Sequence, residues 1–330
     1  MEFTLSVRAP RNRTITPTEA EWASARQRVR AVSELRSGDR DVTVHGDYLD
    51  AAQKIAPASV DLLFLDPPYN LNKKFGDQAF SKRSVEEYSN WLGEVLDDLL
   101  PLVKPDGTVY ICGDWHTSAS IFSAASARLN VHSRITWERE KGRGANKNWK
   151  NASEDIWFCT RGKEYTFNVE EVKLRRKVIA PYRDASGAPK DWNDTEQGGF
   201  RDTHPSNLWT DITIPFWSMP ENTDHPTQKS EKLLAKLLLA STNEGDLVLD
   251  PFLGSGTTSV VARKLNRHFI GIEAHEEYTL LAEHRLEMAL TDKNIQGYSN
   301  GVFWERNSLR FAEAKARASS RRSRQEQLLV

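Results

Sequence analysis

The segment Leu65-Asp-Pro-Pro-Tyr-Asn70 places a carboxylate, two prolines and an aromatic ring directly after an apolar run. That run, Val60 to Leu65, is typical of a buried strand. Each proline fixes its own φ angle and lacks an N–H, so the Asp66 carboxylate and the Pro67 carbonyl are both left as acceptors. Open α/β sheets bind ligands at this carboxyl end of their strands. Taken alone, the segment is also typical of a strand-ending turn with a solvated aspartate.

A second segment, far downstream, has the pattern of a nucleoside-binding loop. Leu247 to Asp250 is typical of a strand, the loop Pro251-Phe-Leu-Gly-Ser-Gly256 follows, and a helix begins at Thr257. Glycines let backbone N–H groups at the helix N-terminus face a ligand. The next strand ends at Glu273, about twenty residues on, where an acid is placed to hold ribose hydroxyls. A lone Gly-x-Gly is weak, but this order of elements indicates a nucleoside-containing cofactor.

The loop also restricts which cofactor fits. Ser259 stands where the third glycine of a dinucleotide fingerprint would fall, and no Gly-Lys-Ser/Thr of a triphosphate site occurs. A nucleoside cofactor without phosphates therefore fits better. S-adenosylmethionine is the candidate.

Four motifs in one order carry a resemblance. Asp66-Pro-Pro-Tyr69 followed by Asp250-Pro-Phe-Leu-Gly-Ser-Gly256 resembles the amino-methyltransferases of DNA, specifically their β group, as found in type II restriction-modification systems. His225-Pro-Thr-Gln-Lys229 and Gly46-Asp-Tyr48 are similar to two further segments of that family. The matched segments cover about residues 42–160 and 222–290.

The resemblance implies roles for particular residues. The catalytic pocket would be formed by Asp66, Pro67, Pro68 and Tyr69. The cofactor would be bound near its adenine by Asp47 and Tyr48, at its methionine carboxylate by Thr227, Gln228 and Lys229, and at its ribose hydroxyls by Glu273. Further cofactor contacts are expected from Asp66, Asp250, Pro251, Phe252, Gly254, Ser255, Gly256, Thr257 and Thr258.

The chemistry of an exocyclic amine agrees with this arrangement. Its nitrogen is a poor nucleophile because the lone pair is delocalised into the ring. Two acceptors directed at its hydrogens, the Asp66 carboxylate and the Pro67 carbonyl, would draw it toward tetrahedral geometry and free the lone pair. The base would have to leave the duplex, and Tyr69 would stack on it.

The identity of the base stays open between two choices. In the family, Asp at the first motif position usually accompanies adenine N6, and Ser usually accompanies cytosine N4, so Asp66 favours adenine. Cytosine-N4 methylation is the alternative within the class. A nicotinamide-dependent oxidoreductase is a less favoured alternative from another class, since it leaves Asp-Pro-Pro-Tyr unexplained.

The elements that position these motifs alternate between strand and helix. Val42–Gly46, Thr108–Cys112, Ile135–Trp137 and Ile156–Cys159 are typical of strands, and Thr18–Leu35, Ser84–Val103 and 116–128 of helices. This alternation predicts an α/β, doubly wound, mostly parallel sheet. The resemblance makes it a seven-stranded, Rossmann-like methyltransferase with an inserted irregular target-recognition region.

The composition fits a globular protein and excludes some classes. The 330 residues are 38% hydrophobic and 28% charged, without a membrane-spanning run or a secretion signal. Two cysteines outside any Cys-x-x-Cys pair indicate the cytoplasm, and the eight histidines show no metal-ligand spacing. Neither a metal nor a membrane is expected.

Binding to double-stranded DNA must rest on local charge, because the net charge is only −1. The segment from Lys141 to Asn151 contains Lys141, Arg143, Lys147 and Lys150 and no acid. It is either a solvated loop or a cationic loop that contacts DNA phosphates.

Five regions are expected along the chain. They are an N-terminal arm (1–40), a catalytic half (41–160), a target-recognition region (161–222), a cofactor-binding half (223–291) and a C-terminal basic tail (292–330). The first could be an arm on a partner or on DNA, or a poorly ordered leader, and the last a basic helix on DNA or a frayed tail. A homodimer is expected from the family alone.

Overall fold

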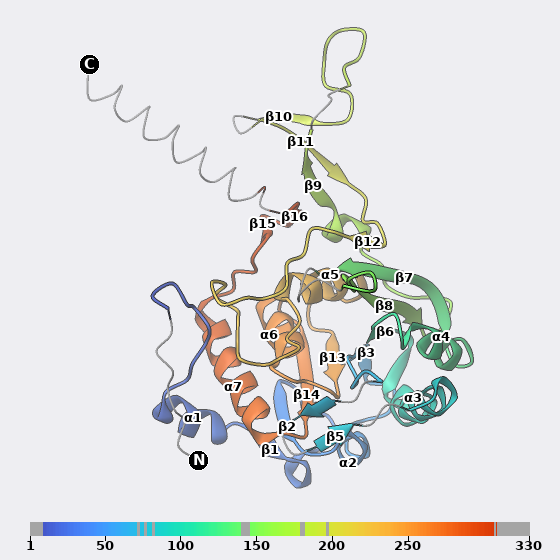
Figure 1. Cartoon of the computed structure of the whole chain (residues 1–330), viewed down its shortest axis with the longest axis vertical. Helices are drawn as coiled ribbons and strands as arrows, with labels where there is room; N and C mark the ends of the chain where they lie inside the picture. The colour runs from blue at the N-terminus through green and yellow to red at the C-terminus, as the bar shows by residue number, and fades with distance from the viewer. Residues whose placement is uncertain are drawn as a thin grey trace.

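The computed structural model describes residues 9–70, 73–75, 78–80, 83–139, 146–178, 182–195, 198–306 and 308. At its centre is a nine-stranded sheet (Figure 1). In spatial order its strands are β1 (Arg30–Ala31), β2 (Val42–His45), β14 (His268–Glu273), β13 (Leu247–Asp250), β3 (Val60–Leu65), β6 (Val103–Gly113), β8 (Ser153–Thr160), β7 (Asn130–Glu138) and β12 (Leu208–Trp209).

The predicted doubly wound, mostly parallel sheet is confirmed. Parallel pairing runs from β1 through β2, β14, β13 and β3 to β6, and β8 is antiparallel to both of its neighbours. The predicted number of seven strands is corrected to nine, because β1 and β12 are two-residue edge strands. Such short strands leave no periodic signal in a sequence.

Helices cover both faces of this sheet. Along β3, Leu62 and Phe64 pack in one hydrophobic cluster with residues of α5 and α6, whereas Leu63 and Leu65 pack in the other with residues of α3 and α4. The helices are α1 (Glu19–Arg26), α2 (Tyr48–Ala52), α3 (Val85–Leu99), α4 (Ser118–Ser126), α5 (Glu231–Ser241), α6 (Thr257–Lys264) and α7 (Glu276–Thr291), with 3-10 turns at Val32–Glu34, Leu100–Leu102 and Val169–Val172.

Two predicted helices end earlier than expected. The helix predicted to reach Leu35 ends at Arg26, after which the chain supplies edge strand β1. The helix predicted over Ser84–Val103 ends at Leu99, and its start is fixed by a Ser84–Glu87 capping box. The turn-forming residues that follow, Lys104 to Gly107, lie inside β6. There the pairing of β6 with β3 shifts register after Val60.

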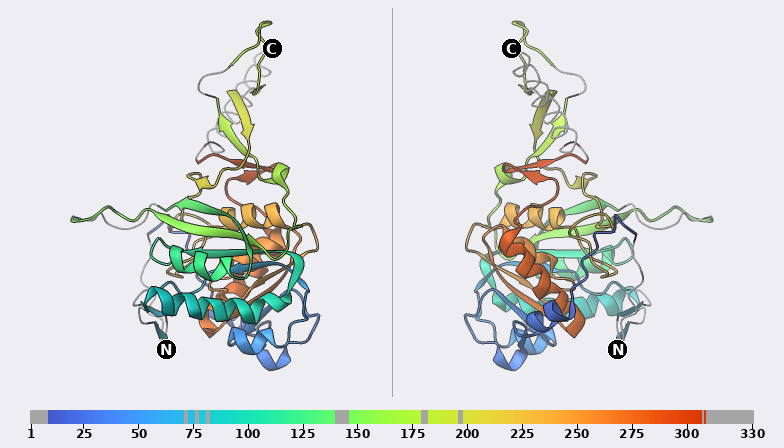
Figure 2. Two further views of the ribbon diagram at one scale, coloured as in Figure 1. Left: turned by 90° about the vertical axis from the view of Figure 1, so that its right-hand side faces the viewer. Right: turned by 90° about the vertical axis from the view of Figure 1, so that its left-hand side faces the viewer.

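A second, five-stranded sheet projects from the body (Figures 1 and 2). Its order is β10 (Asn193–Thr195), β11 (Gly198–Thr203), β9 (Leu174–Lys177), β16 (Val302–Trp304) and β15 (Tyr298–Ser299). It therefore joins part of the predicted target-recognition region to the start of the predicted C-terminal tail. β4 (Lys73–Phe75) and β5 (Gln78–Phe80) form a separate two-stranded antiparallel sheet.

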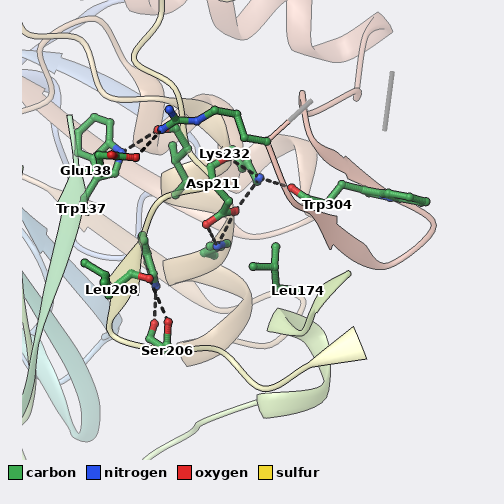
Figure 3. A network of polar contacts seen from close by, with 12 residues as sticks. Trp137, Glu138, Leu174, Ser206, Leu208, Asp211, Lys232 and Trp304 are labelled. Carbon is green, nitrogen blue, oxygen red and sulfur yellow. Dashed lines mark hydrogen bonds and ion pairs between the residues drawn. The ribbon is translucent and has the colours of Figure 1, made fainter. Parts of the chain in front are cut away.

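A buried polar network ties the small sheet to the body (Figure 3). Asp211 accepts two hydrogen bonds of 2.8 Å from Lys236 and forms an ion pair of 2.7 Å with Lys232, both on α5. Lys232 also donates to the backbone carbonyl of Trp304, which ends β16. The three charged side chains are almost fully buried.

The described part of the N-terminal segment, predicted to be an arm, packs on the body. Arg26 and Arg28 pair with Glu276 and Glu283 of α7, at 3.0 and 3.2 Å. The Arg13 backbone N–H donates to the carbonyl of Trp217 at 2.6 Å.

Candidate active site

The site lies where the winding of the sheet changes direction. From β3 the chain proceeds through α3 to β6 on one side, and from β13 it proceeds through α6 to β14 on the other. The two strands pair in parallel, Leu62 with Val248 and Leu63 with Leu249, so Asp66 and Asp250 emerge at the same edge. Such a switch point is where open α/β sheets bind ligands.

A cavity of about 510 Å³ opens at this edge. Its volume is within the usual range for a site that takes a small molecule. Every predicted catalytic and cofactor residue lines it except Gly256: Asp47, Tyr48, Asp66, Pro67, Pro68, Tyr69, Thr227, Gln228, Lys229, Asp250, Pro251, Phe252, Gly254, Ser255, Thr257, Thr258 and Glu273. The two segments that are distant in sequence therefore share one cavity.

Asp66 is held by two neighbours. Its Oδ2 accepts a hydrogen bond of 2.6 Å from Lys229 Nζ, and its Oδ1 accepts one of 3.1 Å from the Tyr69 hydroxyl. Burial opposes the charge on Lys229, but the Asp66 and Glu154 carboxylates outweigh it and raise the pKa of the ammonium. Burial, with the same two acids, raises the pKa of the Tyr69 phenol well above its usual range.

The two prolines differ in their carbonyl contacts. The Pro68 carbonyl accepts a hydrogen bond of 3.1 Å from Tyr88 of α3, which fixes the segment after the strand. Among the described residues, none donates to the Pro67 carbonyl. It is thus left as an acceptor in the cavity wall, as the sequence predicts.

The glycine loop is fixed by its own backbone and by α7. Gly254 and Gly256 have φ angles of +55° and +81°, in the left-handed region that favours glycine. The Gly254 N–H donates to Glu273 Oε2 at 2.8 Å. Arg285 donates to the Ser255 carbonyl at 2.8 Å and to Thr257 Oγ1 at 3.0 Å, and so holds both ends of the turn.

Asp250 is the most enclosed acid of the cavity. It accepts hydrogen bonds from Thr258 Oγ1 at 2.6 Å and from the Phe252 N–H at 3.0 Å. Burial outweighs these bonds and raises the pKa of the Asp250 carboxyl to about 7.

Beside the glycine loop, the Asp47 side chain caps α2 by accepting from the Leu49 N–H at 2.8 Å. Tyr48 lies beside Phe252, with ring centroids 5.3 Å apart. Tyr48, Phe252 and Asp47 therefore give this part of the cavity an aromatic and acidic lining, and a contact with the cofactor adenine stays a prediction.

The segment before α5 is more structural than its sequence suggests. The Gln228 amide donates to the Glu221 carbonyl at 2.7 Å, and its oxygen accepts from Thr223, so the amide is used to hold its own loop. Lys229 points to Asp66. A contact of Thr227, Gln228 or Lys229 with a cofactor carboxylate stays a prediction.

The electrostatics of the wall favour a cationic ligand. The described lining residues include six acids, Asp47, Asp66, Asp114, Glu154, Asp250 and Glu273, against the cations Arg139 and Lys229 and the two histidines His225 and His275. A pyrophosphate would be repelled by this excess of acids, whereas a sulfonium with an amino group would be attracted.

Sequence reasoning missed several lining residues, notably Glu154, Arg139 and Tyr278, and it gave no role to His225, which opens one of the four motifs. Glu154 and Arg139 come from the adjacent ends of β8 and β7, which carry no motif. Glu154 lies two residues before the apolar run Ile156–Cys159, so no local pattern distinguishes it from a solvated acid.

The predicted DNA contacts are only partly described. Lys147 and Lys150 are exposed and flank Trp149, whose side chain is 94% exposed. Lys141 and Arg143 lie outside the described residues. The described ranges contain no cluster of ligands suited to a metal ion, and no helix within them has the length and apolar character needed to cross a membrane.

Comparisons with known proteins agree with this geometry. A family model described as DNA methylase matches residues 60–284. The chain is 35% identical over 253 residues to the DNA adenine methyltransferase YhdJ of Escherichia coli K12, covering 74% of this chain and 82% of the relative. It is 33% identical over 242 residues to the type II methyltransferase M.HpaI of Haemophilus parainfluenzae, covering 72% of each.

Solved structures show the same similarity. The crystal structure of an M1.HpyAVI–SAM complex matches with a TM-score of 0.51 and 25% identity, covering 74% of this chain and 98% of that one.

Proposed function

This chain belongs to the DNA methylase family, and from that premise we propose that it transfers a methyl group from S-adenosylmethionine to the exocyclic N6 of adenine in duplex DNA. One observation carries the proposal: Asp66 and the glycine loop, far apart in sequence, line the same cavity. A methyl donor bound at the glycine loop and an amine held by Asp66 would thus meet in one cavity.

The residues present fit S-adenosylmethionine. When bound, it supplies a methyl group activated by a sulfonium sulfur. Asp47, Tyr48 and Phe252 would hold its adenine, Glu273 its ribose, and the loop from Gly254 to Thr257 its methionine part. The excess of acids in the wall supports a cofactor that is cationic at sulfur and nitrogen.

Asp66 and Pro67 would act on the target amine. The Asp66 carboxylate and the free Pro67 carbonyl accept its two hydrogens, which localises the nitrogen lone pair toward the methyl carbon. The methyl group of the bound cofactor would pass to this nitrogen while the sulfur leaves as a neutral thioether, and the Asp66 carboxylate would take the proton that the nitrogen then loses. Asp66 can accept a hydrogen bond from the amine while it still accepts one from Lys229, because each carboxylate oxygen has two lone pairs.

Adenine is favoured over cytosine for two reasons. Asp66 occupies the motif position that usually accompanies adenine in the family, and the E. coli relative is named a DNA adenine methyltransferase. Because the Asp66 side chain is only 18% exposed, the target base would be flipped from the duplex to reach it, with Tyr69 against its face.

DNA would lie across the cavity mouth, contacted by the exposed Lys147 and Lys150 and by the small sheet. The proposal includes a cytoplasmic enzyme that forms a homodimer, which sedimentation of the purified protein would test.

Nucleoside analysis tests the reaction itself. Unmethylated DNA is incubated with the purified protein and S-adenosylmethionine, digested, and analysed by mass spectrometry. The proposal predicts N6-methyladenine, absent when Asp66 is changed to Ala. N4-methylcytosine would support the alternative base, and no methylated nucleoside would refute the proposal.

A further inference from the structure

Glu154 is a buried acid of the cavity for which the proposed reaction assigns no role. It is the second residue of β8 and only 4% exposed. Because β8 is antiparallel to β6, its beginning lies at the same sheet edge as the carboxyl end of β3. This places Glu154 beside the residues that follow β3.

Its contacts connect it to Asp66 through two shared neighbours. Glu154 Oε2 lies 3.6 Å from Lys229 Nζ and 3.4 Å from the Tyr69 hydroxyl, and both of these groups contact the Asp66 carboxylate. The other oxygen, Oε1, accepts from Arg139, which follows β7. Two acids and two bases from four separate segments therefore form one charge-balanced cluster.

The distances show how the ammonium is shared. Lys229 Nζ is 2.6 Å from Asp66 and 3.6 Å from Glu154, and it is buried at 7% exposure. Without the Glu154 charge, Lys229 would lose the second carboxylate that fixes its position and would follow Asp66 alone. The Asp66 carboxylate could then rotate together with the ammonium and would no longer be held toward the target amine.

We propose that Glu154 is a positioning residue for the methyl transfer, which acts through Lys229 to hold the Asp66 carboxylate in the orientation that accepts the target amine. This inference rests on the proposed function. It also gives Lys229 a task at Asp66 that is distinct from a contact with the cofactor.

The first test is Glu154→Gln, which removes the charge and keeps the shape. We expect kcat to fall about 10- to 100-fold, since small misplacements of a reacting group have effects of this size. The Kd for S-adenosylmethionine and the KM for DNA should stay within about twofold. Glu154→Asp, which keeps the charge, should restore part of kcat.

Asp155→Asn is the matched control. Asp155 is the next residue of the same strand and equally buried, but it accepts from Ser118 and Thr136 outside the cavity, at 2.8 and 3.0 Å. It should lower thermal stability without a selective loss of kcat. A Glu154→Gln variant that loses only stability would reduce Glu154 to the same structural role and overturn the inference.

A double-mutant cycle with Lys229→Met tests the path. If Glu154 acts through Lys229, adding Glu154→Gln to Lys229→Met should change kcat by less than about twofold. The same cycle measured on thermal stability of the free protein should show coupling, because Lys229→Met alone leaves two buried acids unbalanced. Equal losses of kcat in both backgrounds would overturn the inference.

The outcomes separate this inference from the proposed function. A wild-type protein that leaves DNA unmethylated refutes both. A wild-type protein that methylates DNA, beside a Glu154→Gln variant with kcat within about twofold of it, refutes the role of Glu154 alone.

Discussion

At the scale of single residues, Asp66 and Asp250 differ in their burial and in their hydrogen-bond partners. Asp66 is paired with Lys229 and its side chain is 18% exposed, so it is placed to accept hydrogen bonds from a substrate. Asp250 is buried beneath the glycine loop with only a hydroxyl and an N–H as donors, and its pKa is raised to about 7. Burial therefore brings the titration of the Asp250 carboxyl close to neutral pH.

Asp250 gives a prediction about cofactor binding. A cation bound nearby favours the ionised form, so affinity for S-adenosylmethionine should rise several-fold as pH increases through about 7. Binding measured by calorimetry at pH 6, 7 and 8 checks this. Asp250→Asn should flatten the dependence, and an unchanged pH dependence in that variant would contradict the assignment.

The same shift fixes the sign for stability of the free protein. The folded pKa is above the unfolded one, so the contribution of Asp250 is fully present below the unfolded value of 3.8 and is lost as pH rises through about 7.

At the scale of elements, the start of α6 depends on Gly256. Its φ is +81°, and a Cβ there would lie 2.5 Å from Ala282 Cβ on α7. Gly256→Ala should therefore cost backbone strain of about 1 kcal/mol and overpacking of about 1–3 kcal/mol, with weaker cofactor binding. Chemical denaturation measures the loss.

Gly245→Ala is the control for that strain. Gly245 has nearly the same φ, +83°, but no atom lies within 4 Å of its Cβ position. It should lose only the strain, about 1 kcal/mol. Equal losses in the two variants would mean that contact with α7 is not what requires glycine in the loop.

The loop between β7 and β8 gives a prediction about DNA. Changing Lys147 and Lys150 to Gln should weaken DNA binding and reduce the salt slope by about one for each lost phosphate contact. Fluorescence anisotropy over a range of salt concentrations measures both. The control pair is Lys54 and Lys163, exposed lysines in other segments. An unchanged salt slope would mean that Lys147 and Lys150 lie in a solvated loop that does not contact DNA phosphates.

Strong periodicity and motifs made the central elements predictable. The apolar run before Asp66, the strand and glycine loop around Asp250, and the acid at Glu273 all lie as expected. The sequence could not reveal Glu154 and Arg139, because their role arises from the antiparallel pairing of β8 with β6 and β7. Nor could it show that Lys229 contacts Asp66, since that contact depends on tertiary packing.

At the scale of the whole molecule, the joint between body and small sheet depends on Asp211. Asp211→Asn would leave Lys232 and Lys236 buried without a carboxylate, and should cost about 3–5 kcal/mol. Asp202→Asn is the control, because Asp202 pairs with Arg175 at 2.7 Å but both are about 28% exposed, and it should cost at most about 1 kcal/mol. Urea denaturation compares them, and similar losses would contradict a special role for the joint.

The small sheet was the least predictable part of the fold. Its strands have two to six residues and come from both sides of the methylase body, with β16 pairing in parallel with β9. Short strands paired across such a distance give no local pattern. By contrast, the family expected from the four motifs is confirmed. Residues of all four motifs line the cavity.

The central claim is that Asp66 activates the target amine in the cavity that holds the cofactor. Single-turnover methyl transfer by Asp66→Asn, measured beside its affinity for S-adenosylmethionine, tests it most directly. The account predicts a loss of at least about 100-fold in the transfer rate, with affinities for cofactor and DNA within about threefold of wild type. Near-normal transfer by this variant would contradict the claim.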